Sequence, residues 1–308
     1  MAKKVRYEEM LPHEMKRVVA SKPIVYVPCG TLEWHGVHLA LGNDAVKAHE
    51  LSLRCAQKSG GVVTPANYWA MGGLHQPWTV RSEPENLQSI LVVPILENVY
   101  RELERIGFGV IITITGHYGM GQLRAVKKAA LSQMYNGGAI VYAFPEYEVV
   151  ADLGYHGDHA AKWETSILWA LRPELVEMDR LPKDMSEPLV GVGGQDPRTG
   201  ASRKLGREIV KAMVERIAAM AEGFLAYNAE RRREFLKACE RQYEFLSYIM
   251  RGGRADPEIA SKTHGPRRKY LEEVLPAFCA GDYAKAMRLL DGLSMKLARV
   301  MPAVEPEA

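Results

Sequence analysis

The chain has 308 residues, of which 47% are hydrophobic and 25% are charged, and its formal net charge is +3 at pH 7. This composition is that of an ordinary globular protein, and a charge so close to neutrality gives no argument for a nucleic-acid or membrane partner. No apolar run approaches the roughly 20 residues that cross a bilayer. The cysteines at positions 29, 55, 239 and 279 have no metal-type spacing, so we expect reduced thiols in a cytoplasmic protein.

Up to residue 171 the chain alternates strand patterns with helix patterns. An apolar, β-branched run over 23–28 predicts a buried strand, and the clearest further example is the run over 110–115. The other expected elements are strands over 62–69 and 139–144 and helices over 45–57, 83–106, 122–135 and 159–171. This alternation predicts βαβ units, and therefore an α/β fold with a mostly parallel central sheet.

The last third of the chain carries only helix patterns, over 205–251 and as two shorter helices within 266–301. We expect residues 1–225 to form the main domain and residues 226–308 a helical C-terminal extension. Such an extension needs a surface to cover its apolar face, so we expect it to contact another subunit of a homo-oligomer. The apolar side chains expected there are Leu225, Phe235, Leu236, Tyr243, Leu246 and Ile249.

Potential metal ligands follow the first predicted strand directly. Glu33 and His35 are two residues apart, so they point the same way in an extended backbone, and Asp44 stands at the start of the next helix. Two carboxylates and an imidazole suit a divalent metal. The alternative is a loop in which Asp44 caps the helix and His35 is a satisfied core residue. His38, close by, could orient a ligand or be structural.

A second segment with similar chemistry, Gly116-His117-Tyr118, follows the predicted strand over 110–115. In parallel sheets, ligands bind at the carboxyl ends of the strands, and both histidine-bearing segments fall at that edge. The loop over 72–78 carries aromatic and polar tips, as expected of the rim of a substrate site.

A third segment, Asp158-His159-Ala160-Ala161-Lys162-Trp163-Glu164-Thr165-Ser166, completes a set that resembles the creatininase family. The matching features are Glu33-x-His35-Gly36-x-His38-Leu39 with Asp44, then Gly116-His117, then His159-Ala160-x4-Glu164-Thr165-Ser166. They occur in the order and at the spacings of the family, and the resemblance covers roughly residues 20–225.

The resemblance implies a three-layer α/β sandwich with a dinuclear centre of zinc, manganese or iron. It assigns the role of metal ligand to Glu33, His35, Asp44, His117 and Glu164, with Asp44 as the bridging carboxylate. His159 matches a proton-shuttling histidine, and Tyr118 matches a tyrosine that lies against the substrate. The chain departs from the pattern at Gly119, where the type enzyme of the family has a glutamate ligand.

Several side chains are candidates for contacting a small polar ring. They are Trp34, His75, Trp78 and Tyr118. A core position is an alternative for Trp34, because large aromatic side chains are mostly buried. For His159 the alternative is a cap at the start of the helix, beside Asp158.

These observations predict a metal-dependent hydrolase of a small-molecule substrate. A metal pair can polarise a carbonyl and activate water near neutral pH, and a histidine can protonate the leaving group. The expected reaction opens a small cyclic amide or amidine, or cleaves a formamide, at a C–N bond. One alternative is hydrolysis of a cyclic polyol diketone at the same centre. Another is a metal-binding member of the family that lacks catalysis.

Overall fold

The computed structural model describes residues 4–69, 73–74, 76–80, 91–252 and 257–300. The chain divides into two compact units. The first comprises Met1–Val150 and Tyr155–Ala226, and the second comprises Ala151–Gly154 and Tyr227–Ala308. None of the helices in the described residues is long and apolar enough to cross a membrane.

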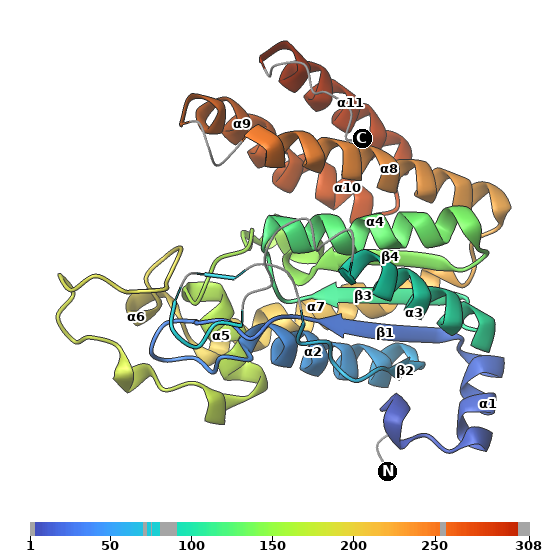
Figure 1. Cartoon of the computed structure of the whole chain (residues 1–308), viewed down its shortest axis with the longest axis horizontal. Coiled ribbons are helices and arrows are strands. Elements are labelled where there is room, and N and C mark those ends of the chain that lie inside the picture. The colour runs from blue at the N-terminus through green and yellow to red at the C-terminus, as the bar shows by residue number, and fades with distance from the viewer. Residues whose placement is uncertain (1–3, 70–72, 75, 81–90, 253–256, 301–308) are drawn as a thin grey trace. The chain divides into compact units, whose positions relative to one another are not determined.

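The first unit is built on a four-stranded parallel sheet with the strand order β2-β1-β3-β4. The strands are β1 (Ile24–Cys29), β2 (Val62–Val63), β3 (Val110–Thr115) and β4 (Ile140–Pro145). Every residue of these strands is buried, as their β-branched composition predicts for a sheet covered on both faces. The carboxyl ends of β1, β3 and β4 lie at one edge of the sheet (Figure 1).

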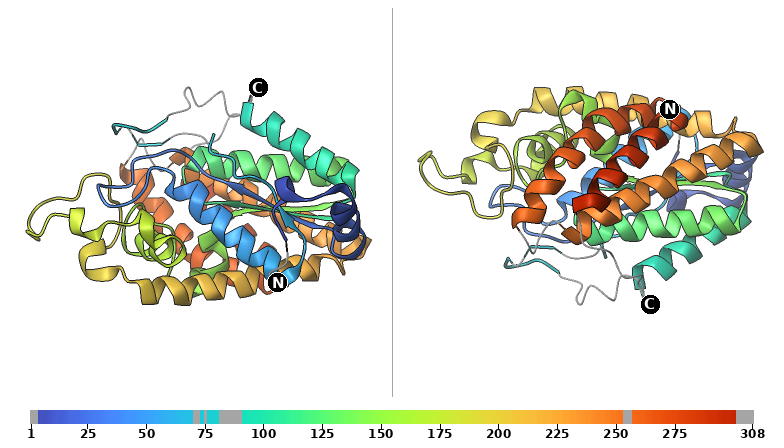
Figure 2. Two further views of the ribbon diagram at one scale, coloured as in Figure 1. Left: turned by 90° about the horizontal axis from the view of Figure 1, so that it is seen from below. Right: turned by 90° about the horizontal axis from the view of Figure 1, so that it is seen from above.

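Helices cover both faces of this sheet, with α3 and α4 on one side and α2 and α7 on the other (Figures 1 and 2). The helices of this unit are α1 (Pro12–Ser21), α2 (Asn43–Ser59), α3 (Val93–Ile106), α4 (Met120–Asn136), α5 (Lys162–Leu171), α6 (Pro197–Gly200) and α7 (Arg203–Phe224). The predicted three-layer sandwich with a parallel central sheet is confirmed.

Two elements of the first unit differ most clearly from the sequence prediction. The strand expected over 62–69 ends at Val63, and only isolated bridges follow at Asn67 and Trp69. The register changes there, because Val63 pairs with Tyr26 but Asn67 pairs with Cys29, so the segment carries one residue more than β1 between the two pairs. Helix α5 begins at Lys162 instead of His159, since Ala160 has a left-handed backbone (φ 51°). Of the helix expected over 83–106, residues 83–90 lie outside the described residues.

The end of the chain is helical, as predicted, but the pattern expected over 205–251 is broken between Phe224 and Ala229, and helix α9 begins ahead of the two helices expected within 266–301. Helical elements make up the second unit. They are α8 (Ala229–Gly252), α9 (Pro257–Lys269), a π-helical turn (Tyr270–Val274), α10 (Leu275–Cys279) and α11 (Tyr283–Val300). The ring of Phe235 packs against those of Phe278 and Tyr283, with centroids 5.9 and 5.3 Å apart. Phe235, Leu246 and Ile249, which we expected to face another subunit, are already buried in a single chain.

Candidate metal centre

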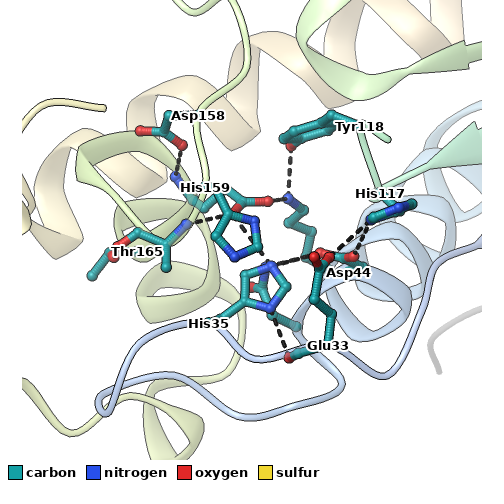
Figure 3. Close-up of polar contacts among 12 residues, drawn as sticks. Glu33, His35, Asp44, His117, Tyr118, Asp158, His159 and Thr165 are labelled. Carbon is teal, nitrogen blue, oxygen red and sulfur yellow. Dashed lines mark hydrogen bonds and ion pairs between the residues drawn. The ribbon is translucent and has the colours of Figure 1, made fainter. Parts of the chain in front are cut away.

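The structure brings the five predicted metal ligands together at the carboxyl edge of the sheet, and Figure 3 shows Glu33, His35, Asp44 and His117 among them. Glu33 and His35 follow β1, Asp44 lies in the first turn of α2, His117 follows β3, and Glu164 lies in the first turn of α5. All five side chains are buried. The five residues come from four separate segments of the chain, so their convergence is a property of the fold and not of one motif.

Asp44 stands at the centre of this group, as Figure 3 shows. Its Oδ1 lies 2.9 Å from Nε2 of His35, and its Oδ2 lies 3.0 Å from Nδ1 of His117. Asp44 therefore belongs to two sets of potential ligands, one with Glu33 and His117 and the other with His35 and Glu164. Within each set the ligand atoms lie within 4.8 Å of one another.

Two glycines allow Asp44 to reach this position. A Cβ added at Gly30, just after β1, would overlap the backbone of Asp44 and Ala45. A Cβ added at Gly116, just after β3, would overlap the carbonyl oxygen of Asp44. The ends of both strands therefore approach the first turn of α2 more closely than any larger residue would allow. The N-terminus of a helix also favours a carboxylate electrostatically.

The ring of His35 is oriented by the backbone. Its Nδ1 donates a hydrogen bond to the carbonyl oxygen of Glu33 over 2.9 Å, which leaves Nε2 as the nitrogen facing Asp44 and Oε2 of Glu164. Among the described residues this buried Nε2 has no partner other than these two carboxylates. Metal-binding histidines are commonly held in this way, with one nitrogen on a backbone carbonyl and the other on the metal.

The two carboxylate oxygens of Glu33 face different partners, as the two ring nitrogens of His35 do. Oε1 accepts a hydrogen bond from the backbone N–H of Leu74 over 2.6 Å, whereas Oε2 lies 3.0 Å from Nδ1 of His117. In the described part of the chain, Oε2 has no hydrogen-bond partner other than this ring. Buried polar atoms that are poorly paired are costly, and divalent cations bound at the two sets would give each of these atoms a partner. The mixture of imidazole and carboxylate ligands fits zinc, manganese or iron.

The carboxylates change the pKa values of both histidines. Burial lowers the pKa of His35, but the negative charges of Asp44 and Glu164 outweigh it and raise that pKa to about 9. Burial also lowers the pKa of His117, and hydrogen bonds with Asp44 and Glu33 raise it to about 10. Without a metal, each imidazole therefore holds a proton at neutral pH in the place that a cation would take.

His159 lies on the loop before α5 and not within the helix. Its ring stacks on that of His35 with centroids 4.2 Å apart, and its Nε2 lies 2.8 Å from the carbonyl oxygen of Trp34. Its backbone N–H and carbonyl both bond to Gly193. The loop is therefore anchored and not free to swing. The helix is capped by Asp158, which accepts hydrogen bonds from the backbone N–H groups of Trp163 and Glu164.

The predicted substrate-contacting residues do not form one group. The Tyr118 hydroxyl is held 2.6 Å from Nζ of Lys47 and donates to Oε1 of Glu146 over 2.5 Å. Trp34 and Trp78 line a cavity of about 550 Å³, and none of the five predicted ligands is among the described residues that line it. His75 lies outside the described residues.

Two residues beside the ligands, Lys47 and Glu146, were not singled out from the sequence, whereas Asp158 and His38 were. Lys47 and Glu146 are fully buried and form an ion pair of 3.1 Å. Asp158 is largely buried, and burial and the charge of Glu164 raise its pKa to about 7. His38 binds Oγ1 of Thr165 through Nε2 over 2.9 Å, which ties the loop after β1 to α5. Lys47 lies three residues after Asp44 on α2, so the two side chains share one face of the helix. This spacing is the sequence feature that places Lys47 near the ligands.

Known proteins share this sequence pattern and fold. Residues 8–221 match the family described as Creatininase, creatinine amidohydrolase. A creatinine amidohydrolase from Pseudomonas putida is 27% identical over 205 residues, which cover 59% of this chain and 77% of that protein.

Solved structures agree in fold. A creatinine amidohydrolase (creatininase) covers 73% of this chain and 100% of its own length, with a TM-score of 0.61 and 22% identity. A structure called Creatininase Mn and a mutant creatininase of Zn-Zn type each cover 72% of this chain and 99% of their own, with TM-scores of 0.60 and 24% identity. Because the family match spans most of the chain, the protein belongs to the creatininase family of metal-dependent hydrolases.

Proposed function

We propose that this protein uses two divalent ions to hydrolyse a C–N bond in a small polar substrate, either a cyclic amide or amidine or a formamide. The observation that carries the proposal is the position of Asp44. Each of its oxygens lies about 3 Å from a different histidine, at 2.9 Å from His35 and 3.0 Å from His117. One carboxylate shared by two ligand sets is the arrangement that bridges a metal pair.

We infer that Glu164 supplies the ligand that is missing at Gly119. A side chain at Gly119 would begin against the ring of His117, since an added Cβ would overlap Nε2. Oε2 of Glu164 lies 3.5 Å from Nε2 of His35 and belongs to the set with Asp44. The centre would then hold one ion on Glu33, Asp44 and His117 and the other on His35, Asp44 and Glu164. Relatives of this chain include Creatininase Mn and a Zn-Zn type creatininase, which supports manganese or zinc, and iron fits the same ligands.

When bound, the two ions would polarise the scissile carbonyl and lower the pKa of a coordinated water. The protein's own side chains supply orientation and proton transfer. With its Nε2–H on the carbonyl oxygen of Trp34, His159 has Nδ1 left to carry a proton to the leaving nitrogen. Its stacking on His35 keeps that ring beside the ligand set. His159 is therefore assigned as the general acid.

The C–N bond is favoured because the relatives with solved structures and the relative from Pseudomonas putida are creatinine amidohydrolases. The test is a screen of the metal-loaded protein against creatinine, other lactams, cyclic amidines, formamides and cyclic diketones, followed by mass spectrometry. Hydrolysis of a nitrogen compound should add the mass of one water or release formate. The matched control is Asp44→Asn, which should be inactive on every compound.

Two outcomes of this screen contradict the proposal. If the protein hydrolyses only cyclic diketones, the proposed metal centre stands but the assignment of a C–N bond is wrong. Activity that survives in Asp44→Asn would show that the reaction does not depend on the shared carboxylate.

A further inference from the structure

A buried lysine lies directly behind the proposed centre. The side chain of Lys47 is fully buried, and its Nζ contacts Oη of Tyr118 at 2.6 Å, Oε1 of Glu146 at 3.1 Å and Oε1 of Glu164. A lysine ammonium has three N–H donors, and here three acceptors surround it. Lys47 is thus fixed in place, and its nitrogen has no free position from which to act on a substrate.

The contact with Lys47 determines how Glu164 is presented. Oε1 is bound to the ammonium, while Oε2 accepts a hydrogen bond from the backbone N–H of Ala160 over 2.7 Å and faces His35 at 3.5 Å. The carboxylate is therefore held from both ends of its O–C–O unit. A single oxygen, Oε2, is left to face the set that includes Asp44.

The ammonium group of Lys47 also forms an ion pair with a second carboxylate, that of Glu146. Glu146 follows β4 at the same edge of the sheet and is fully buried. Its Oε1 contacts both Lys47 and the Tyr118 hydroxyl, and its Oε2 has no hydrogen-bond partner within the described residues. Without an opposite charge beside it, this buried carboxylate would be unpaired and would be drawn toward bound cations, and Lys47 provides that charge.

We propose that Lys47 is a positioning residue of the metal centre. It fixes Glu164 as a one-oxygen ligand of the ion on His35 and Asp44, and it keeps Glu146 out of the ligand set. This inference rests on the proposed function, since it assumes that the centre binds metal. Lys47 is not one of the predicted ligands, and it acts through Glu164 rather than on the substrate.

The test uses the metal-free full-length protein titrated with Co²⁺, with absorption spectra that report the geometry of each ion and a competing chelator that gives the two dissociation constants. Wild-type protein should bind two ions. Lys47→Met should weaken one of the two ions by about 10- to 100-fold, the usual effect of losing an outer-shell partner, and leave the other unchanged.

Two further variants separate positioning from general stability. Lys47→Met/Glu146→Gln removes the unpaired buried charge, so it should recover the melting temperature lost in Lys47→Met but not the metal affinity. If Lys47→Met does not fold, metal affinity is measured on the double variant instead. Lys127→Met is the matched control, because Lys127 is another buried lysine, paired with Glu148 at 3.1 Å. It should lower the melting temperature and bind both ions normally.

The failure of this inference differs from that of the proposed function. If wild-type protein binds no Co²⁺ at the centre, the metal-dependent function itself is wrong. If wild-type protein binds two ions and the double variant binds both with unchanged affinity and spectra, Lys47 does not position a ligand. Equal weakening in Lys127→Met would show a general effect of destabilisation and would also overturn the inference.

Discussion

The affinity of the proposed centre for metal should rise steeply with pH. In the metal-free protein the surrounding carboxylates outweigh the effect of burial and hold the pKa of His35 at about 9 and that of His117 at about 10. Each imidazole must lose its proton before it can bind a metal. Between pH 6.5 and 8, binding of two ions should therefore release about two protons, and the overall two-ion constant should rise about 100-fold per pH unit.

The proton count can be measured by calorimetry of Mn²⁺ binding in buffers with different ionisation enthalpies, and the slope by chelator competition at three pH values. His49→Gln is the control, because His49 is a partly exposed histidine beside Arg6 and not among the proposed ligands. Its slope should equal that of the wild-type protein. A release of less than one proton, or an affinity that does not change with pH, would refute the assignment of both histidines as ligands.

Four other results are expected. Glu164→Gln should lower metal content and activity together, and full metal content in this variant would contradict its role as a ligand. His159→Asn should keep the metal and lose about 10²- to 10⁴-fold in rate, whereas loss of the metal would make His159 a ligand instead. Gly30→Ala should lower metal content by displacing Asp44, while Gly223→Ala, where a Cβ meets nothing within 4 Å, should leave it unchanged. Because the pKa values of the two ligand histidines are raised above their usual value near 6.5, the metal-free protein should lose stability from pH 7 to 10. A Tm that rises over this range would show that these groups do not titrate in this way.

The sheet was the part of the fold that the sequence predicted best. The run over 110–115 is β-branched throughout and became β3 (Val110–Thr115) without a shift of either end. The strand expected over 62–69 stopped at Val63, although its composition is equally apolar at the start, because one extra residue between Val63 and Asn67 shifts its register against β1. Continuous apolar patterns thus located the buried strands, whereas the change of register that ends β2 has no counterpart in the apolar pattern.

The proximity of site residues could be predicted from the sequence only for those that directly follow a strand. Glu33, His35 and His117 follow two strands that pair in register, so their proximity follows from the topology. The role of Lys47 could not be predicted in this way, because charged residues at helical spacing usually face solvent. Its partners Tyr118 and Glu164 lie 71 and 117 residues further along the chain, and only the folded structure shows that they meet.

The central claim is that two ions share Asp44, and anomalous diffraction from crystals of the manganese- or zinc-loaded protein tests it most directly. We expect two anomalous peaks about 3.5–4 Å apart, one on each side of the Asp44 carboxylate. The first should lie beside Glu33 and His117 and the second beside His35 and Glu164. A single peak, or peaks that do not touch Asp44, would contradict this account.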